Sequence, residues 1–396
     1  MIRFSEVKVL QFILVILPFI DTLNGFLNDG ANESGISIGM IYRIVVLFFC
    51  VVMLIFRGIY RSDLYCLLLV ILGIFLSLFS TATLDYLILL LKLLLPLLLV
   101  FLFKIYIGKG LLPTNFFEKL FNVWGILFIS TILIPYFLGI GFNTYGEGAA
   151  GYKAFYYSQN DLGFILVLLF VYSLMNLDRK KNFKTIVVAV LTLFCGIILG
   201  LKSVYLIDFL FILIFLYEKR LTIPNIIKNL FYTIFGIGSV YIFFIFFSEN
   251  ILGILNRWEY FLKQSTSLIS FLSSSRIDRL PRVFTWLAEN NYHGLIFGTG
   301  LEYTKVTSAF VPQIQIEMDF FDVLFQIGVF GVCGIYSTYL GILVFYRVTR
   351  IDNLLFWVAL CYSFLVGHVI ESALSGMFFS AFIGLIIEKG KDINVI

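Results

Sequence analysis

The chain has 396 residues, of which 61% are hydrophobic and only 13% are charged, and its mean hydropathy is +1.01. Soluble globular proteins have about half apolar and about a quarter charged residues, so this composition excludes an ordinary soluble domain and indicates a polytopic membrane protein. The net charge of +4 gives no indication of nucleic-acid binding, because basic loops orient membrane proteins in any case. The five cysteines lack metal-like spacing, so we expect no metal site, disulfide or cofactor.

Apolar segments of roughly 20 residues recur along the chain, which is the length that a membrane-spanning helix needs. Helices are expected there because lipid leaves the backbone no other way to satisfy its hydrogen bonds. We therefore predict an all-α fold with about twelve spans, forming one transmembrane domain over residues 1–396. The predicted spans are residues 9–26, 39–56, 64–80, 86–103, 120–139, 162–177, 185–200, 204–217, 230–247, 323–346, 352–367 and 374–388.

Lysines and arginines gather at alternate ends of these spans, where eighteen of the 28 are found. The positive-inside rule makes those ends cytoplasmic, so both termini are expected in the cytoplasm. The one long interruption, residues 248–322, then lies outside the membrane on the opposite side. Its basic residues do not contradict this, since long loops translocate largely regardless of charge.

Several ionisable residues lie within or at the ends of the predicted spans. On the predicted topology all of them fall in the outer half of the membrane. They are Asp21, Arg43, Lys92, Asp208, His368 and Glu371. A buried charge costs at least roughly 2.5–3.5 kcal/mol at the centre of a bilayer, so such residues usually face a polar cavity. We interpret the set as lining a cavity open to the outside, and the alternative is that each side chain snorkels to the headgroups.

Within the long loop, Arg276, Arg279 and Arg282 recur every three residues. A helix is expected to begin at Arg279, capped by Asp278, with an apolar stripe formed by Leu280, Val283, Phe284 and Leu287. The opposite face would carry Arg279, Arg282, Trp286 and Glu289. Arginines beside a helix N-terminus favour a bound anion such as phosphate. The alternative is an interfacial helix whose arginines meet lipid headgroups.

Three carboxylates, Glu317, Asp319 and Asp322, precede the tenth predicted span. If they lie in a helix, Asp319, Asp322 and Gln326 share one face, and Glu317 points elsewhere or lies before the helix begins. A carboxylate beside a cationic site is able to act as a general base toward a hydroxyl. The alternative is an acidic residue favoured by the helix dipole. His293 and His368 have no metal-like spacing and are interpreted as ordinary polar contacts.

Four segments carry a resemblance to the superfamily of Wzy-type O-antigen or capsule polymerases and WaaL-type ligases. Gly200-Leu201-Lys202-Ser203 looks like the family's basic residue after a small-residue turn, and residues 276–300 look like its arginine, tryptophan and glycine-rich pattern. Residues 317–331 are similar to the polymerase segment that re-enters the membrane. Residues 157–160, ending in Asn160, look like a family asparagine site. The predicted layout, with one large outer loop late in the chain, also fits.

The resemblance implies glycosyl transfer at the outer face of the bacterial cytoplasmic membrane. A growing glycan would pass from undecaprenyl pyrophosphate to the terminal hydroxyl of a new lipid-linked repeat unit. Membrane lipids and a chain-length regulator protein are the partners that such a reaction suggests. The resemblance implies three sets of site residues. The catalytic residues would be Glu317, Arg282 and Arg276, and the residues that bind the pyrophosphate would be Lys202, Arg279, Arg43 and Lys92. The residues that bind the glycan would be Asn160, Trp286 and Asp319.

Two alternatives share this layout. WaaL-type ligases usually carry a His-Asn pair where this chain has Glu317-Met318, which favours polymerase over ligase. A flippase for lipid-linked oligosaccharides would also have about twelve spans. Transporters, however, tend to place their sites near the membrane midplane and to consist of repeated halves, and neither feature is visible here.

Overall fold

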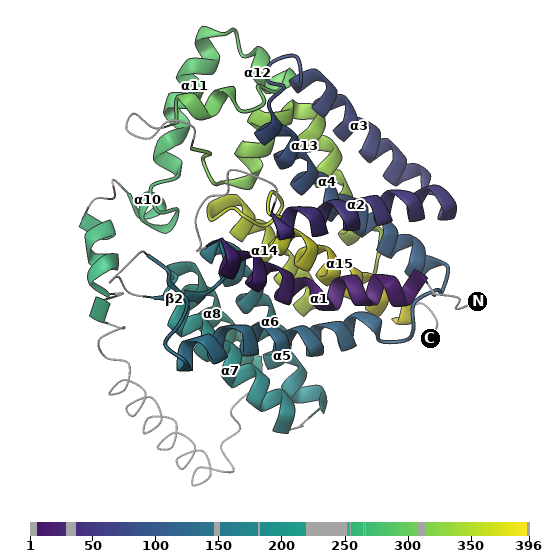
Figure 1. The fold of residues 1–396 in the computed structure, drawn as a ribbon, viewed down its shortest axis with the longest axis vertical. Coiled ribbons are helices and arrows are strands. Elements are labelled where there is room, and N and C mark those ends of the chain that lie inside the picture. Colours follow the sequence, from purple (N-terminus) through teal and green to yellow (C-terminus); the bar gives the residue numbers. More distant parts are fainter. Residues whose placement is uncertain are drawn as a thin grey trace. The chain divides into compact units, whose positions relative to one another are not determined.

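A computed structural model describes residues 6–28, 37–145, 151–180, 183–218, 252–307 apart from 254, 264 and 266, and 314–393. These residues divide into two compact units, of which the first comprises residues 1–24, 32–124 and 266–396 and the second residues 25–31 and 125–265. Helices dominate both units (Figure 1). The only strands in the described part of the chain are β1 (Phe142–Asn143) and β2 (Tyr152–Ala154), which pair antiparallel.

The helices follow the hydropathy of the sequence closely. Their bounds are α1 (Glu6–Leu27), α2 (Ile38–Arg57), α3 (Arg61–Ser77), α4 (Leu84–Gly108), α5 (Phe116–Phe137), α6 (Gln159–Lys180), α7 (Phe183–Leu199), α8 (Lys202–Glu218), α10 (Leu268–Leu272), α11 (Leu280–Glu289), α12 (His293–Phe297), α13 (Asp319–Phe345), α14 (Arg350–Leu365) and α15 (Ala373–Ile393). Short 3₁₀ turns flank α11 and α12 at η2 (Ile277–Arg279) and η3 (Glu302–Lys305).

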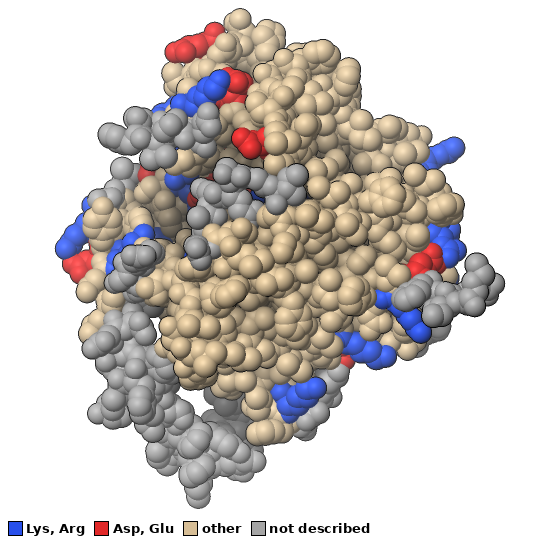
Figure 2. All heavy atoms as spheres, viewed as in Figure 1, with Lys and Arg blue, Asp and Glu red and all other residues tan. Residues whose placement is uncertain are grey.

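Eleven of the twelve predicted spans coincide with helices of the structure. The ninth, residues 230–247, lies outside the described residues. Among the described residues, seven helices are long and apolar enough to cross a membrane, namely α1, α2, α4, α5, α6, α13 and α15. The chain is therefore a helical, multi-pass membrane protein. Most of the face drawn in Figure 2 is uncharged, and exposed side chains such as Phe48 and Phe56 are suited to contact with lipid tails.

In the first unit, α4 and α15 form the buried centre. The windows that would span the membrane are 67% buried in α4 and 89% buried in α15. Pro96 lies inside α4, and Ser380 Oγ of α15 donates a hydrogen bond to the Pro96 carbonyl at 2.8 Å. This hydrogen bond ties α15 to α4 beside the proline. Pro18 and Pro135 also lie inside helices.

The long helix α13 is interrupted at Gly328, where φ is +68° and ψ is −175°. A side chain there would overlap the carbonyl of Ile296 in α12. Glycine alone permits both this conformation and this close approach. The interruption lets α12 pack directly against α13, and the Thr299 and Gly300 N–H groups after α12 donate hydrogen bonds to the Phe325 and Gln326 carbonyls of α13.

In the second unit, α6 is the central helix and contacts both α7 and α8. The β1–β2 ribbon is tied to the end of α7, because Thr144 Oγ1 donates a hydrogen bond to the Leu199 carbonyl at 2.8 Å. Gly200, with φ +79°, then turns the chain into α8, which begins at Lys202. The small-residue turn before a basic residue, seen in the sequence, is thus a sharp connection between two helices.

Candidate functional site

The segment around α11 positions the three arginines of the first unit. The predicted apolar stripe is confirmed, because Leu280, Val283 and Leu287 are buried. The predicted cap is wrong, since α11 begins without a side-chain cap. Asp278 instead lies inside η2 and accepts a hydrogen bond from Ser270 Oγ. The Asp278 carboxylate therefore bonds to the Ser270 hydroxyl and not to the N–H groups at the start of α11.

The predicted polar face of α11 is only partly correct. Arg282 and Glu289 are exposed, as expected. Arg279 and Trp286 are half-buried, and Trp286 packs against the apolar cluster that joins α11 to the start of α13. Arg282 thus remains a candidate for an incoming ligand, while Trp286 contributes first to packing.

Arg276 forms an ion pair with Glu317, 41 residues further along the chain. Its Nε and Nη2 atoms lie 2.9 and 2.8 Å from Oε2 of Glu317. The Arg276 side chain is only 9% exposed, whereas that of Glu317 is 33% exposed. Burial raises the pKa of Glu317, but the positive charges of Arg276, His368 and Arg279 outweigh it, so the pKa lies below its usual value. Glu317 is therefore ionised at neutral pH.

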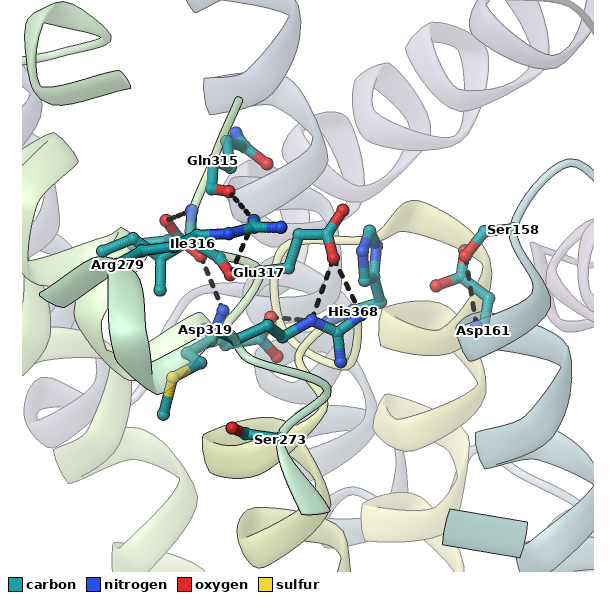
Figure 3. Close-up of polar contacts among 12 residues, drawn as sticks. Ser158, Asp161, Ser273, Arg279, Gln315, Ile316, Glu317, Asp319 and His368 are labelled. Carbon is teal, nitrogen blue, oxygen red and sulfur yellow. Dashed lines mark hydrogen bonds and ion pairs between the residues drawn. The ribbon is translucent and has the colours of Figure 1, made fainter. Parts of the chain in front are cut away.

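Arg279 lies beside this pair without a carboxylate of its own. Its Nη1 atom donates to the backbone carbonyls of Gln315 at 2.7 Å and Ile316 at 3.3 Å (Figure 3). Carbonyl oxygens satisfy the N–H group but do not neutralise the charge, and burial lowers the pKa of Arg279. The carboxylates of Glu317 and Asp322 both act on Arg279 electrostatically, but neither forms an ion pair with it that would occupy its guanidinium group. A guanidinium group with N–H donors suits an anionic ligand such as phosphate.

Asp322 fixes the backbone segment that carries Glu317. It lies in the first turn of α13, and its side chain is completely buried. One carboxylate oxygen accepts hydrogen bonds from Tyr303 Oη at 2.6 Å and from the Ile316 N–H at 3.0 Å. The other accepts from the Met318 N–H at 2.8 Å. Glu317 lies between these two anchored residues, before the helix begins, with φ +65°.

Asp319 fixes a second loop, which connects α14 to α15. Its carboxylate accepts hydrogen bonds from three consecutive N–H groups, those of His368, Val369 and Ile370, at 2.7–2.8 Å, and from Ser363 Oγ at 2.7 Å. The residue is 1% exposed. The sequence indicated Asp319 as a candidate for binding glycan. In the structure its carboxylate instead accepts hydrogen bonds from backbone N–H groups of the loop.

The structure brings four of the predicted in-span charges together in the first unit. Arg43 pairs with Asp21 between α2 and α1. Lys92 on α4 acts electrostatically on both Asp21 and Glu371. Glu371 in turn accepts a hydrogen bond from Gln326 Nε2 at 3.3 Å. These contacts connect Asp21, Arg43, Lys92 and Glu371 within the first unit, and the cavity open to the outside stays a prediction.

Lys202 and Asn160 belong to the second unit. Lys202 Nζ lies 5.0 Å from the centre of the Phe261 ring. Arg257, which the sequence reasoning missed, lies over the same ring at 5.1 Å and over the Tyr145 ring at 4.0 Å. Cations over aromatic faces are stabilised without losing their charge. The run Arg257-Trp258-Glu259-Tyr260-Phe261, a basic residue among aromatic ones, was the available signal. Asn160 lies in the first turn of α6.

Within the described residues no group of three or more histidine, cysteine, aspartate or glutamate side chains could hold a metal ion. Comparison with known proteins gives no family assignment, because no family model and no curated protein matches the chain.

Proposed function

We propose that this protein is a membrane polysaccharide polymerase of the type that its sequence resembles. The proposed donor is a growing glycan on undecaprenyl pyrophosphate, and the proposed acceptor is a hydroxyl of a new lipid-linked repeat unit. The observation that carries the proposal is the cluster of Arg276, Arg279 and Glu317 at the start of α13. It combines two arginines with a partly exposed carboxylate in a protein whose helices suit a membrane.

The chemistry asks little of the protein beyond stabilising charge. As the bond from the anomeric carbon to the diphosphate oxygen breaks, negative charge grows on the leaving group. Fixed cations are worth most where charge develops and water is scarce. The hydrogen-bond partners of Arg279 are carbonyl oxygens, which do not neutralise its charge, so its guanidinium group is able to stabilise the leaving group. Arg282, exposed and one turn further along α11, would extend the same positive surface.

The experiment is to reconstitute the purified protein in lipid nanodiscs and to supply undecaprenyl-pyrophosphate-linked repeat units. A ladder of products on the same lipid supports the polymerase. Transfer only to a lipid A core acceptor would identify a ligase instead. Movement of the substrate across a vesicle membrane without bond formation would identify a flippase.

Two variants connect the activity to the cluster. Glu317→Gln and Arg276→Ala should each abolish long products. Glu302→Gln is the matched control, because this substitution removes the same charge elsewhere in the loop. Glu302 forms an ion pair with Lys305 within η3. Ladders of normal length from the Glu317 and Arg276 variants would refute the assignment of the site.

A further inference from the structure

His368 lies beside Glu317, although the two residues are 51 positions apart. Its charge acts on the Glu317 carboxylate, and Figure 3 shows its imidazole ring next to that carboxylate. His368 is half-buried, while Gly367, Val369 and Ile370 around it are buried. Glu317 has the same setting between Ile316 and Met318. Each loop therefore buries its backbone neighbours and leaves one ionisable side chain accessible.

Both residues adopt a left-handed backbone conformation, with φ +65° at Glu317 and +59° at His368. Such a conformation is unfavourable for residues with a side chain and persists only where the surroundings fix it. Here Asp322 fixes the first loop and Asp319 the second, each through backbone N–H groups. Gly367 lets the two loops touch, since a side chain there would overlap the Glu317 carbonyl. Strain at two adjoining accessible ionisable residues indicates a site built for chemistry.

Glu317 is a weak proton acceptor in this arrangement. Two N–H groups of Arg276 occupy its Oε2 atom, and both stabilise the ionised carboxylate. A neutral imidazole, by contrast, accepts a proton readily near neutral pH, and an adjacent carboxylate stabilises the imidazolium that results.

We propose that His368 accepts the proton of the acceptor hydroxyl and that Glu317 stabilises the imidazolium formed, with Asp319 as the positioning residue. The inference rests on the proposed polymerase function. The acceptor oxygen forms a bond to the anomeric carbon, and its proton passes to a ring nitrogen of His368. The bond from that carbon to the diphosphate oxygen breaks, and the electron pair leaves with the diphosphate. His368 then releases the proton to water.

Several charged groups surround His368. Glu317 and Asp319 are negative and close, the latter through the His368 N–H. Arg276 and Arg279 act electrostatically on the same Glu317 carboxylate. Glu371 is three residues further along the same loop and is influenced by Lys92. Protonation of the imidazole removes the proposed proton acceptor, so the rate should fall on the acid side.

The test is chemical rescue of His368→Gly in nanodiscs. Glycine suits the left-handed backbone at this position, so the variant should keep the loop conformation. We expect the rate of ladder formation to fall at least 100-fold and to recover at least tenfold on addition of imidazole. His293→Gln, which replaces the exposed and only other histidine, should polymerise at the wild-type rate. Asp319→Asn should lower the rate without being rescued by imidazole.

A pH profile gives the second measurement. The wild-type rate should fall on the acid side with one protonation, and this limb should disappear in His368→Gly measured without imidazole. A wild-type ladder together with a normal rate in His368→Gly would overturn the inference and leave the polymerase proposal intact. Loss of activity without rescue and with the acid limb retained would also overturn it. No ladder from the wild-type protein would instead refute the proposed function itself.

Discussion

Replacing Asp322 by asparagine tests whether this carboxylate holds the segment that carries Glu317. The change preserves volume, so no cavity forms in the buried site. An asparagine is able to keep its oxygen toward Tyr303 and Ile316, which leaves its NH₂ group facing the Met318 N–H. That N–H group loses its acceptor, at a cost of about 2 kcal/mol. The two remaining hydrogen bonds change from charge-assisted to neutral and together lose about another 1–2 kcal/mol.

The total, about 3–4 kcal/mol, should appear as easier local opening of residues 314–318. Because 1.4 kcal/mol corresponds to a tenfold change in an equilibrium constant, we expect amide hydrogen exchange there to accelerate about 100-fold or more. Mass spectrometry of the peptide covering residues 314–322, in detergent or nanodiscs, measures this directly. Tyr303→Phe removes only one of the three donors and should accelerate exchange about tenfold.

The matched control is Asp85→Asn, which changes an exposed carboxylate in the first turn of α4. It should leave exchange in residues 314–322 unchanged. If Asp322→Asn exchanges at the wild-type rate in this peptide, the claim that Asp322 holds the loop is wrong.

Three further predictions concern the same unit. Gly367→Ala should destabilise the protein and abolish ladder formation, because the alanine side chain would overlap the Glu317 carbonyl. Gly58→Ala is the control, since Gly58 also has a positive φ but open space around it. Thermal unfolding of Gly58→Ala should therefore show only the smaller cost of backbone strain. The ion pair with Arg276 lowers the pKa of Glu317, so it stabilises the folded protein only while the carboxylate is ionised. The stability of the wild-type protein should therefore decrease as the pH falls below about 4.3, the ordinary pKa of glutamate. Arg276→Ala should reduce this dependence when unfolding is measured as a function of pH. Asp63→Ala should destabilise by about 3–5 kcal/mol, because it leaves Lys104 charged and buried, and the double variant Asp63→Ala/Lys104→Met should recover part of that loss in the same unfolding assay.

Sequence pattern was sufficient to place the helices because hydropathy acts over each segment independently. The same reasoning explains why α11 buries Leu280, Val283 and Leu287, since a helical period alone decides that face. It also placed Asp319 and Asp322 on one helical face, and of the two alternatives left open for Glu317 the structure has the one in which it precedes the helix. These successes concern residues close together in the chain.

The partners of these residues could not be predicted, because each joins segments far apart in sequence. Arg276 meets Glu317, Asp319 meets the loop at His368, and Gln326 meets Glu371. Each contact depends on loop conformations that residue types do not signal, such as the positive φ at Glu317 and at His368. The sequence consequently indicated only an ordinary polar role for His368. It also predicted Asp278 as a helix cap, whereas the Asp278 carboxylate accepts a hydrogen bond from Ser270 Oγ.

The start of α13 explains how two loops come to share one site. Asp319 and Asp322 are three residues apart, so a helical turn places them on one side of the helix. One holds the loop of His368 and the other the loop of Glu317, each by backbone N–H groups. Burying two carboxylates is costly, but both accept several hydrogen bonds and both lie where the helix dipole favours negative charge. The positions of Glu317 and His368 therefore depend on a single helix terminus, so shifting where α13 begins should disturb both residues together.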